Sequence, residues 1–165
     1  MIKMNLITTL SLVDASRITE DALAAGRDDS RAPLTVVVLD AGGRILCVKS
    51  EDGSGIMRFD VAFGKAWGSL GMGISSRLIR DRLSARPAFQ NALAAASDGR
   101  LIPVPGGVLV KDGDGAVIGA VGISGDTSER DEYCAITAIR AAGFACEPAA
   151  PDPDWRTSSL SDKPE

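Results

Sequence analysis

Two short turns do most to limit what this chain can fold into, because each joins two apolar, strand-like runs. The turns Asp40-Ala-Gly-Gly43 and Asp112-Gly-Asp-Gly115 have the Gly and Asp content that is typical of tight hairpins. The runs that they separate are residues 34–39 and 44–49 for the first turn, and 107–111 and 116–124 for the second. The sequence therefore predicts two β-hairpins, and the unbroken apolar run of the first predicts a strand buried on both faces.

Apolar residues at helical spacing predict five helices around these hairpins. The first begins at the capping-box-like Ser11-Leu-Val-Asp14 and ends near Gly26. The second carries one apolar stripe, formed by Met57, Val61, Ala62, Lys65 and Ala66. The other three cover about 76–83, 87–96 and 128–142. The order helix, hairpin, helices, hairpin, helix has no long parallel crossover, so it favours an α+β three-layer sandwich over a doubly wound sheet.

Composition limits the classes of partner. The chain has 165 residues, of which 45% are hydrophobic, and this is enough for the core of one domain. Its net charge is −4 and its 18 Lys and Arg residues are spread out, whereas nucleic-acid binding requires a concentrated basic face. No apolar run approaches the ~20 residues that cross a bilayer, and the opening residues 1–10 are interrupted too early for a signal peptide. We therefore expect a cytoplasmic protein that binds neither nucleic acid nor membrane.

The last part of the chain differs in composition from the rest. After Cys146 it contains Pro148, Pro151, Pro153 and Pro164 with several charges, which cannot form a core alone. We expect one domain at residues 1–147 and a proline-rich arm at 148–165. Trp155 is costly to leave in water, so it predicts that the arm docks on its own domain or on a neighbouring subunit.

The stretch from Gly119 to Asp131 is the most plausible ligand site, because a strand of small residues runs into a glycine turn and then a capped helix. Gly122 and Gly125 let the backbone approach a bound molecule, and the free N–H groups of the helix favour an anion. Polar side chains at the same edge come from Ser124, Asp126, Thr127 and Ser128. The alternative is an ordinary strand-to-helix turn in which one of the last three residues is the N-cap.

Four blocks in one order resemble the GlcG/HbpS-like family, often described as haem-binding or haem-degrading. The blocks are Val36 to Gly43, Arg58 to Ala66, Pro103 to Gly107, and Gly119 to Asp131. The resemblance covers roughly residues 8–144 and is more specific than any single block. It implies an α/β/α domain with a central antiparallel sheet, profilin-like or roadblock-like, that assembles into dimers or larger homo-oligomers. It also implies a role linked to haem, to corrinoid enzymes or to small organic acids.

The resemblance also implies a pocket, and its residues match the recurrent blocks. They are Arg58, Asp60, Lys65, Gly106, Gly107, Gly122, Ser124, Gly125 and Asp131. The Arg58 guanidinium suits a carboxylate in a bidentate fork. Lys65 lies in a largely apolar helix, where it serves as an anion ligand, as an acid or base, or as a structural partner of a carboxylate. Asp131 and Glu132, at the first turn of the last helix, are also explained by the helix dipole.

The chain contains no histidine, the usual proximal ligand of haem iron, and this weakens the case for haem as a cofactor. Cys47, Cys134 and Cys146 show no CxxC spacing, so we expect free, packed thiols rather than a disulfide framework or a zinc site. Cysteine, methionine or Tyr133 remain as ligands of haem iron, or haem sits unligated against apolar residues. We expect no metal site and no required cofactor.

Three functions remain open. The first is a small-ligand-binding protein with a pocket, between the second and last helices, for a haem-like tetrapyrrole or a small organic anion. The second is a cofactor-independent isomerase, tautomerase or lyase in which Lys65 or Asp131 moves a proton, Ser124 or backbone N–H groups stabilise an enolate, and Arg58 holds a small carboxylate substrate. The third is a structural oligomer whose glycines serve only close packing. The sequence favours binding over catalysis, since it contains no complete catalytic set.

Overall fold

The computed structural model describes residues 6–28 and 32–160. Its centre is a five-stranded antiparallel sheet in the order β2-β1-β4-β3-β5. The strands are β1 (Thr35–Asp40), β2 (Ile45–Ser50), β3 (Gly107–Lys111), β4 (Val117–Ser124) and β5 (Ala145–Glu147). Both predicted hairpins are confirmed, and β1 pairs with β4 to join them into one sheet.

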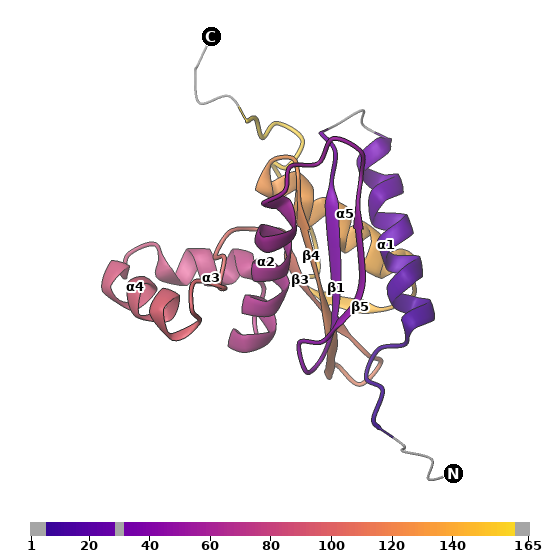
Figure 1. The fold of residues 1–165 in the computed structure, drawn as a ribbon, viewed down its shortest axis with the longest axis horizontal. Helices are drawn as coiled ribbons and strands as arrows, with labels where there is room; N and C mark the ends of the chain where they lie inside the picture. Colours follow the sequence, from indigo (N-terminus) through magenta and orange to yellow (C-terminus); the bar gives the residue numbers. More distant parts are fainter. Residues whose placement is uncertain (1–5, 29–31, 161–165) are drawn as a thin grey trace.

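Helices cover both faces of the sheet (Figure 1). The helices are α1 (Leu12–Arg27), α2 (Arg58–Met72), α3 (Ser76–Leu83), α4 (Pro87–Ala96) and α5 (Ser128–Ala141). α1 and α5 lie on one face, α2 lies on the other, and α3 with α4 projects to the side beyond α2 (Figure 1). The predicted three-layer α/β/α sandwich with a central antiparallel sheet is therefore confirmed.

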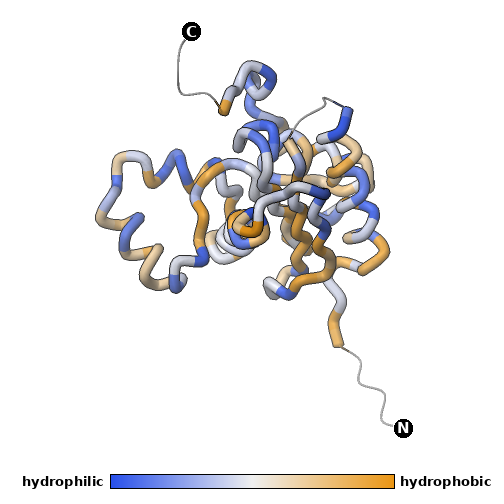
Figure 2. Tube along the Cα trace, turned by 45° about the horizontal axis from the view of Figure 1, so that its top comes forward, coloured by the Kyte–Doolittle hydropathy of each residue, from blue (hydrophilic) through white to orange (hydrophobic). Residues whose placement is uncertain are grey.

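The sheet separates two cores, as the alternation along β1 shows. Val36 and Val38 pack toward α1 and α5, while Val37 and Leu39 pack toward α2. All four are fully buried, which confirms a first strand buried on both faces. Figure 2 shows the most hydrophobic segments gathered in these central strands.

Local signals set the helix ends. The Ser11 hydroxyl accepts the N–H of Asp14 at 3.0 Å and donates to the Asp14 carboxylate at 2.6 Å, so the capping interaction at α1 is confirmed with Asp in the Glu position. The stripe predicted for α2 is correct at Ala62, Lys65 and Ala66 but wrong at Met57. Met57 is the N-cap residue of α2 and is 69% exposed, since it precedes the turns that contact the sheet.

The short strand β5 was not predicted. It pairs with β3 through Leu109, Val110 and Lys111, and its three residues alone carry no strand pattern. No helix within the described ranges is long and apolar enough to cross a membrane. A cytoplasmic location stays a prediction, and residues 1–5 and 161–165, which include Pro164, lie outside the described residues.

Candidate functional site

A buried ion pair links the two helical layers at one end of the sheet. Lys65 Nζ of α2 lies 2.9 Å from Asp131 Oδ2 of α5, and it also donates to the main-chain oxygen of Ile123 at 2.8 Å. The Lys65 and Asp131 side chains are only 2% and 1% exposed. Burial raises the pKa of Asp131, while the ammonium of Lys65 opposes that shift. The two residues therefore contact each other rather than solvent.

Three of the predicted site glycines make room for α2 and this ion pair. A Cβ on Gly106, whose φ is +114°, would lie 2.9 Å from Lys65 Nζ. A Cβ on Gly107 would lie 2.3 Å from the Lys65 carbonyl oxygen, and one on Gly122 would lie 1.9 Å from that of Ala62. The absence of a Cβ at these positions lets the α2 backbone pack directly on β3 and β4. The space that a side chain would take there is filled by the helix.

The turn between β4 and α5 is held by its own side chains. Thr127 is the N-cap of α5, and its hydroxyl accepts the N–H of Arg130 at 3.4 Å. Asp126 accepts the N–H of Thr127 at 2.7 Å, and its own N–H donates to Asp131 Oδ1 at 3.1 Å. A Cβ on Gly125 would lie 2.4 Å from the carbonyl oxygen of Pro33. Asp126 and Gly125 therefore shape the turn, and the start of α5 faces outward from it.

An open cleft of about 340 Å³ lies at this start of α5, and we call it the α5 cleft. Its lining residues are Arg80, Val104, Pro105, Thr127, Ser128, Glu129, Ser159 and Leu160. The first N–H groups of a helix have no acceptor within it, so those of Ser128 and Glu129 are donors at the wall of the cleft. Arg80 adds a cation that is itself paired, since its Nε lies 3.0 Å from Asp81 Oδ1 and its Nη1 lies 3.5 Å from Glu129 Oε1.

Arg58 and Ser124 form a second polar group near the same end of the sheet. Arg58 Nη1 donates to Ser124 Oγ at 3.3 Å, and Ser124 is only 1% exposed. Asp60 lies apart from both groups: it is exposed and lines a different cleft of about 340 Å³ with Phe63 and Arg100. The structure thus brings most predicted site residues to one region but separates Asp60 from them.

Residues 148–160, which we call the arm, dock on α5 and α3 (Figure 1, yellow). The Trp155 ring stacks on Tyr133 with 3.6 Å between centroids and is 7% exposed. Arg130 Nη2 donates to the Arg156 oxygen at 2.9 Å, and Thr127 Oγ1 lies 2.6 Å from Ser158 Oγ. These contacts are within one chain, and a contact of the arm with a neighbouring subunit stays a prediction.

The residues that could ligate haem iron are dispersed. Cys134 is buried in the core beneath α1 and α5, and Cys47 is on the edge strand β2. Cys146 donates to the Pro148 oxygen at 3.2 Å, and burial raises the pKa of its thiol. In the described ranges none of the three cysteines forms a disulfide, and no three His, Cys, Asp or Glu side chains are grouped to hold a metal ion.

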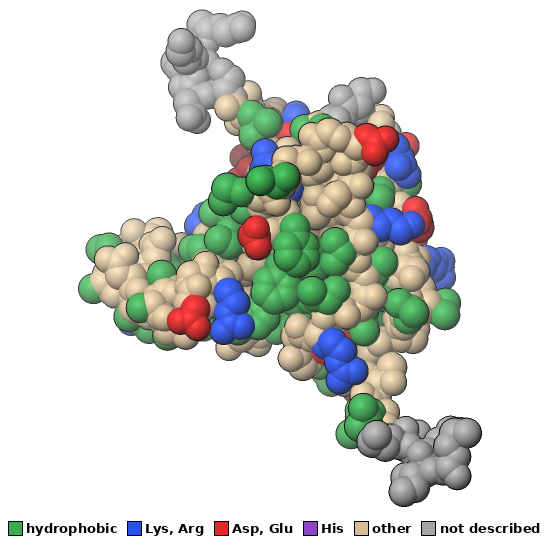
Figure 3. Space-filling view, viewed as in Figure 1, with side chains coloured by type: hydrophobic (Ala, Val, Ile, Leu, Met, Phe, Trp, Pro, Cys, Tyr) green, Lys and Arg blue, Asp and Glu red, His purple; other side chains and the backbone are tan. Residues whose placement is uncertain are grey.

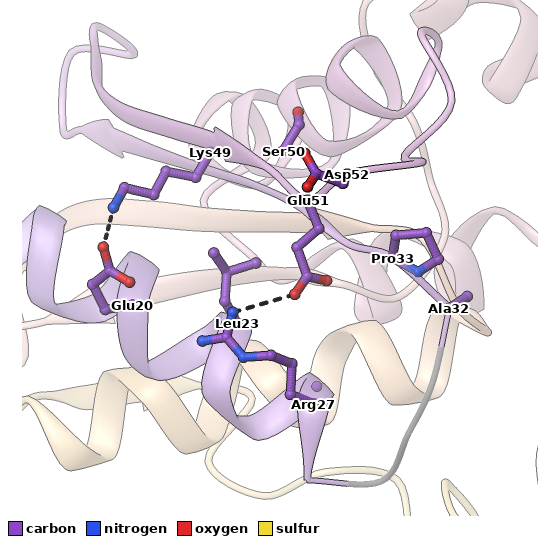
Figure 4. Close-up of a pocket in the computed structure, with 10 residues that line it drawn as sticks. Glu20, Leu23, Arg27, Ala32, Pro33, Lys49, Ser50, Glu51 and Asp52 are labelled. Atoms are coloured by element: carbon purple, nitrogen blue, oxygen red, sulfur yellow. Dashed lines mark hydrogen bonds and ion pairs between the residues drawn. The ribbon is translucent and has the colours of Figure 1, made fainter.

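Sequence reasoning missed a larger cleft of about 740 Å³ between α1 and β2 (Figure 4). Its two cations already have partners, because Lys49 pairs with Glu20 and Arg27 Nη1 lies 3.4 Å from Glu51 Oε1. Strand alternation places Lys49 and Glu51 on the same side of β2 as Cys47, toward α1. This alternation was the sequence signal that could have indicated a polar cleft between α1 and β2. Its cations are thus paired, as Arg80 is in the α5 cleft, but its described lining includes no residue from the first turn of a helix.

Comparisons with known proteins agree with this architecture. The family model described as "Haem degrading protein HbpS-like" matches residues 10–140. An uncharacterized 15.0 kDa protein from the dhaT-dhaS intergenic region of Citrobacter freundii is 29% identical over 139 residues, which are 84% of this chain and 96% of that protein.

Solved structures share the fold. The crystal structure of a PduOC:heme complex has a TM-score of 0.74 at 26% identity, covering 82% of this chain and 96% of that one. Klebsiella pneumoniae protein ORFY has a TM-score of 0.73 at 25% identity, covering 87% and 97%. HbpS itself has a TM-score of 0.71 at 24% identity, covering 84% and 94%, a likeness of fold.

Proposed function

This chain belongs to the HbpS-like family of haem degrading proteins. On that premise we propose that it binds a small haem-related or organic ligand and recognises the carboxylate groups of that ligand. The single observation that carries the proposal is the α5 cleft, whose lining combines the first residues of α5, with their N–H donors and the Ser128 hydroxyl, with Arg80. Val104, Pro105 and Leu160 add an apolar wall. A PduOC relative has been crystallised with heme, which supports the ligand class.

The size of the α5 cleft limits how a ligand enters. At about 340 Å³ it lies at the small end of ligand sites, which span about 300–1,000 Å³. A small organic acid fits whole, whereas a tetrapyrrole enters with its carboxylate edge only. Iron ligation does not fit this cleft, because its described lining contains no Cys, Met or Tyr and the chain has no His. Recognition of a ligand in this cleft therefore rests on the carboxylate groups of the ligand.

Burial favours binding over catalysis at the Lys65 and Asp131 pair. A proton-transfer residue must reach its substrate to within hydrogen-bond distance. Lys65 and Asp131 are at most 2% exposed and satisfy each other, so they support the fold that holds the cleft. Ser124 is equally buried beneath Arg58. No specific contact favours the enzymatic alternative.

The test is a titration of the purified protein with haemin and with iron-free protoporphyrin IX, which share the same carboxylates. We expect both to saturate with affinities within a few-fold of each other. Ser128→Pro should weaken both about tenfold, because proline is tolerated at the first helical position and removes the N–H donor together with the Ser128 hydroxyl. Arg80→Gln should weaken both to a similar degree.

The matched control is Arg82→Gln, an equal charge change on the exposed side of α3 outside the cleft. It should bind like the wild type. A haemin-specific Soret shift without porphyrin binding would instead indicate iron ligation, and equal affinities of Arg80→Gln, Ser128→Pro and wild type would exclude the α5 cleft.

We also propose that the protein self-associates through an apolar patch on α2 and β2. Figure 3 shows hydrophobic side chains gathered in the middle of this face. Ile45 and Val48 are 45% and 36% exposed on the edge strand, and Phe59 of α2 is 36% exposed beside Phe63. Open strand edges and contiguous apolar surface are features of protein interfaces, and a second copy supplies an identical patch.

A further inference from the structure

Glu132 is a buried carboxyl group that the proposed ligand site does not use. Its side chain is 0% exposed, yet neither carboxylate oxygen has a hydrogen-bond partner of ordinary geometry in the described part of the chain. The nearest cation is Arg77 of α3, whose Nε lies 3.4 Å from Glu132 Oε2. A buried carboxylate without hydrogen bonds is costly, so the neutral acid is the form that suits this position.

The arm lies against Glu132, beside α3 and β5. Arg77 contacts Glu132 through Nε and donates from Nη2 to the Ala150 oxygen of the arm at 2.9 Å. The main chain of Asp152 lies close to the Glu132 carboxyl group. The next residue of α5, Tyr133, stacks on Trp155 of the arm. Lifting the arm would therefore open Glu132 to solvent.

The same arm forms one wall of the α5 cleft. Beyond Trp155, the chain is tied to α5 through the Arg130 donation to the Arg156 oxygen and through the Thr127 and Ser158 hydroxyls. Ser159 and Leu160 then line the cleft together with Arg80. Movement of the arm would consequently change the cleft as well as the surroundings of Glu132.

Charged groups from every neighbouring element act on Glu132. Arg77 and Arg80 of α3 and the main-chain N–H of Asp152 favour its ionised form, whereas the carboxylate of Asp152 disfavours it. On β5, the Cys146 thiol lies close enough to interact, and Glu147 is held by Ser75. On α5 itself, Glu129 pairs with Arg80, and Asp131 pairs with Lys65. Burial outweighs the two arginines and raises the pKa of Glu132 to about 7.

We propose that the arm is a strap across the α5 cleft that docks when Glu132 is protonated and is released when Glu132 ionises. The inference concerns the arm and stands whichever ligand the cleft binds. It does not require a second chain or a bound metal.

The direction of the pH effect follows from proton linkage. With the arm docked the pKa of Glu132 is about 7, and lifting the arm admits water and moves it toward the ordinary value of 4.5. The docked state therefore holds more protons between these two values, so docking weakens as the pH rises from about 4.5 through 7. The full difference sets an upper limit of about 300-fold on the change in the docking equilibrium. The chain has no histidine, which removes the usual source of titration near neutrality.

The test uses the full-length chain with Trp67→Phe, which leaves Trp155 as the sole tryptophan. Acrylamide quenching of Trp155 fluorescence is measured from pH 5 to 9. We expect quenching to increase several-fold as the pH rises through neutrality, and to stay low and flat when Glu132→Gln is added. A flat profile in the parent protein, or the same rise in Glu132→Gln, would overturn the proposal.

A second pair of variants keeps the test decisive if Glu132→Gln does not fold. Asp152→Asn removes a negative charge that disfavours ionisation of Glu132 in the docked state, so it lowers the docked pKa of Glu132 and should make the rise in quenching with pH smaller than in the parent. Asp154→Asn is the matched control, since it makes the same change at an exposed arm residue. Trypsin cleavage after Arg156, normalised to a free peptide at each pH, should show the same reduced rise with pH in Asp152→Asn. An equal rise in Asp152→Asn, Asp154→Asn and the parent would contradict the strap.

Discussion

At the scale of single residues, the contact of Lys65 with Asp131 shows most clearly what the sequence alone cannot reveal. This contact joins α2 to α5 past the end of the sheet. The two residues are 66 positions apart in sequence. The sequence shows that Lys65 lies on an apolar stripe, but no local pattern identifies its partner. Its role as a structural pair member was one of the readings left open, and the ion pair supports that reading.

Removing one partner of the pair should destabilise the fold strongly. Lys65→Met leaves Asp131 buried without its cation, and breaking a buried pair in this way costs about 3–5 kcal/mol. The free energy of unfolding, measured by urea denaturation with circular dichroism, checks this. The double variant Lys65→Met with Asp131→Leu should recover part of the loss because no unpaired charge remains.

The control is Lys49→Met, which removes an exposed partner of Glu20 and should change the free energy of unfolding little. If Lys65→Met were as stable as Lys49→Met, the buried pair would not contribute to stability.

At the scale of secondary-structure elements, the close approach of α2 to the sheet depends on residues without side chains. Gly107 and Gly122 lie where a Cβ would enter the α2 backbone. The sequence reading assigned Gly122 to contact with a ligand, and the structure places the Ala62 carbonyl oxygen there. Glycine allows close approach in either case, so composition alone could not distinguish a helix from a ligand.

Two glycine-to-alanine changes should have opposite signs. Gly122→Ala introduces a Cβ only 1.9 Å from the Ala62 oxygen, so α2 must shift, at a cost of about 3 kcal/mol or more. Gly71→Ala is in α2 and meets nothing within 4 Å, so it should stabilise the protein by about 0.5–1 kcal/mol. Thermal unfolding measures both, and equal melting temperatures would show that α2 packs less closely.

Most element boundaries were predictable because local signals carry them. The predicted ranges for α3, α4 and β3 agree with the structure, and α5 ends within a residue of its expected end. β5 was missed because a strand of three residues exists only through its pairing with β3. The burial of Glu132 was missed for a similar reason, since the arm that lies against it follows α5 in the chain and carries no pattern that says where it docks.

At the scale of the whole molecule, the apolar patch on α2 and β2 remains open on one face (Figure 3). Phe59→Glu combined with Val48→Glu places two like charges of each copy into a self-complementary contact. We expect size-exclusion chromatography with light scattering to give an oligomer for the wild type and a monomer for this variant. Leu12→Glu, at a 63% exposed position outside the patch, should leave the mass unchanged.

A monomeric wild type would contradict self-association itself. An oligomer that survives both patch substitutions would instead place the interface elsewhere on the surface.

The lateral projection of α3 and α4 has a consequence for how the chain tolerates being lengthened or reconnected. α4 contributes no buried side chain, and α3 shares only a small cluster with Leu101. The connection at residues 84–86 is exposed throughout. New termini from circular permutation, or an inserted reporter peptide, would therefore enter here without crossing either core. The connection between α3 and α4 is the part of the molecule where evolution and engineering have the most freedom, while the three layers of the sandwich stay as they are.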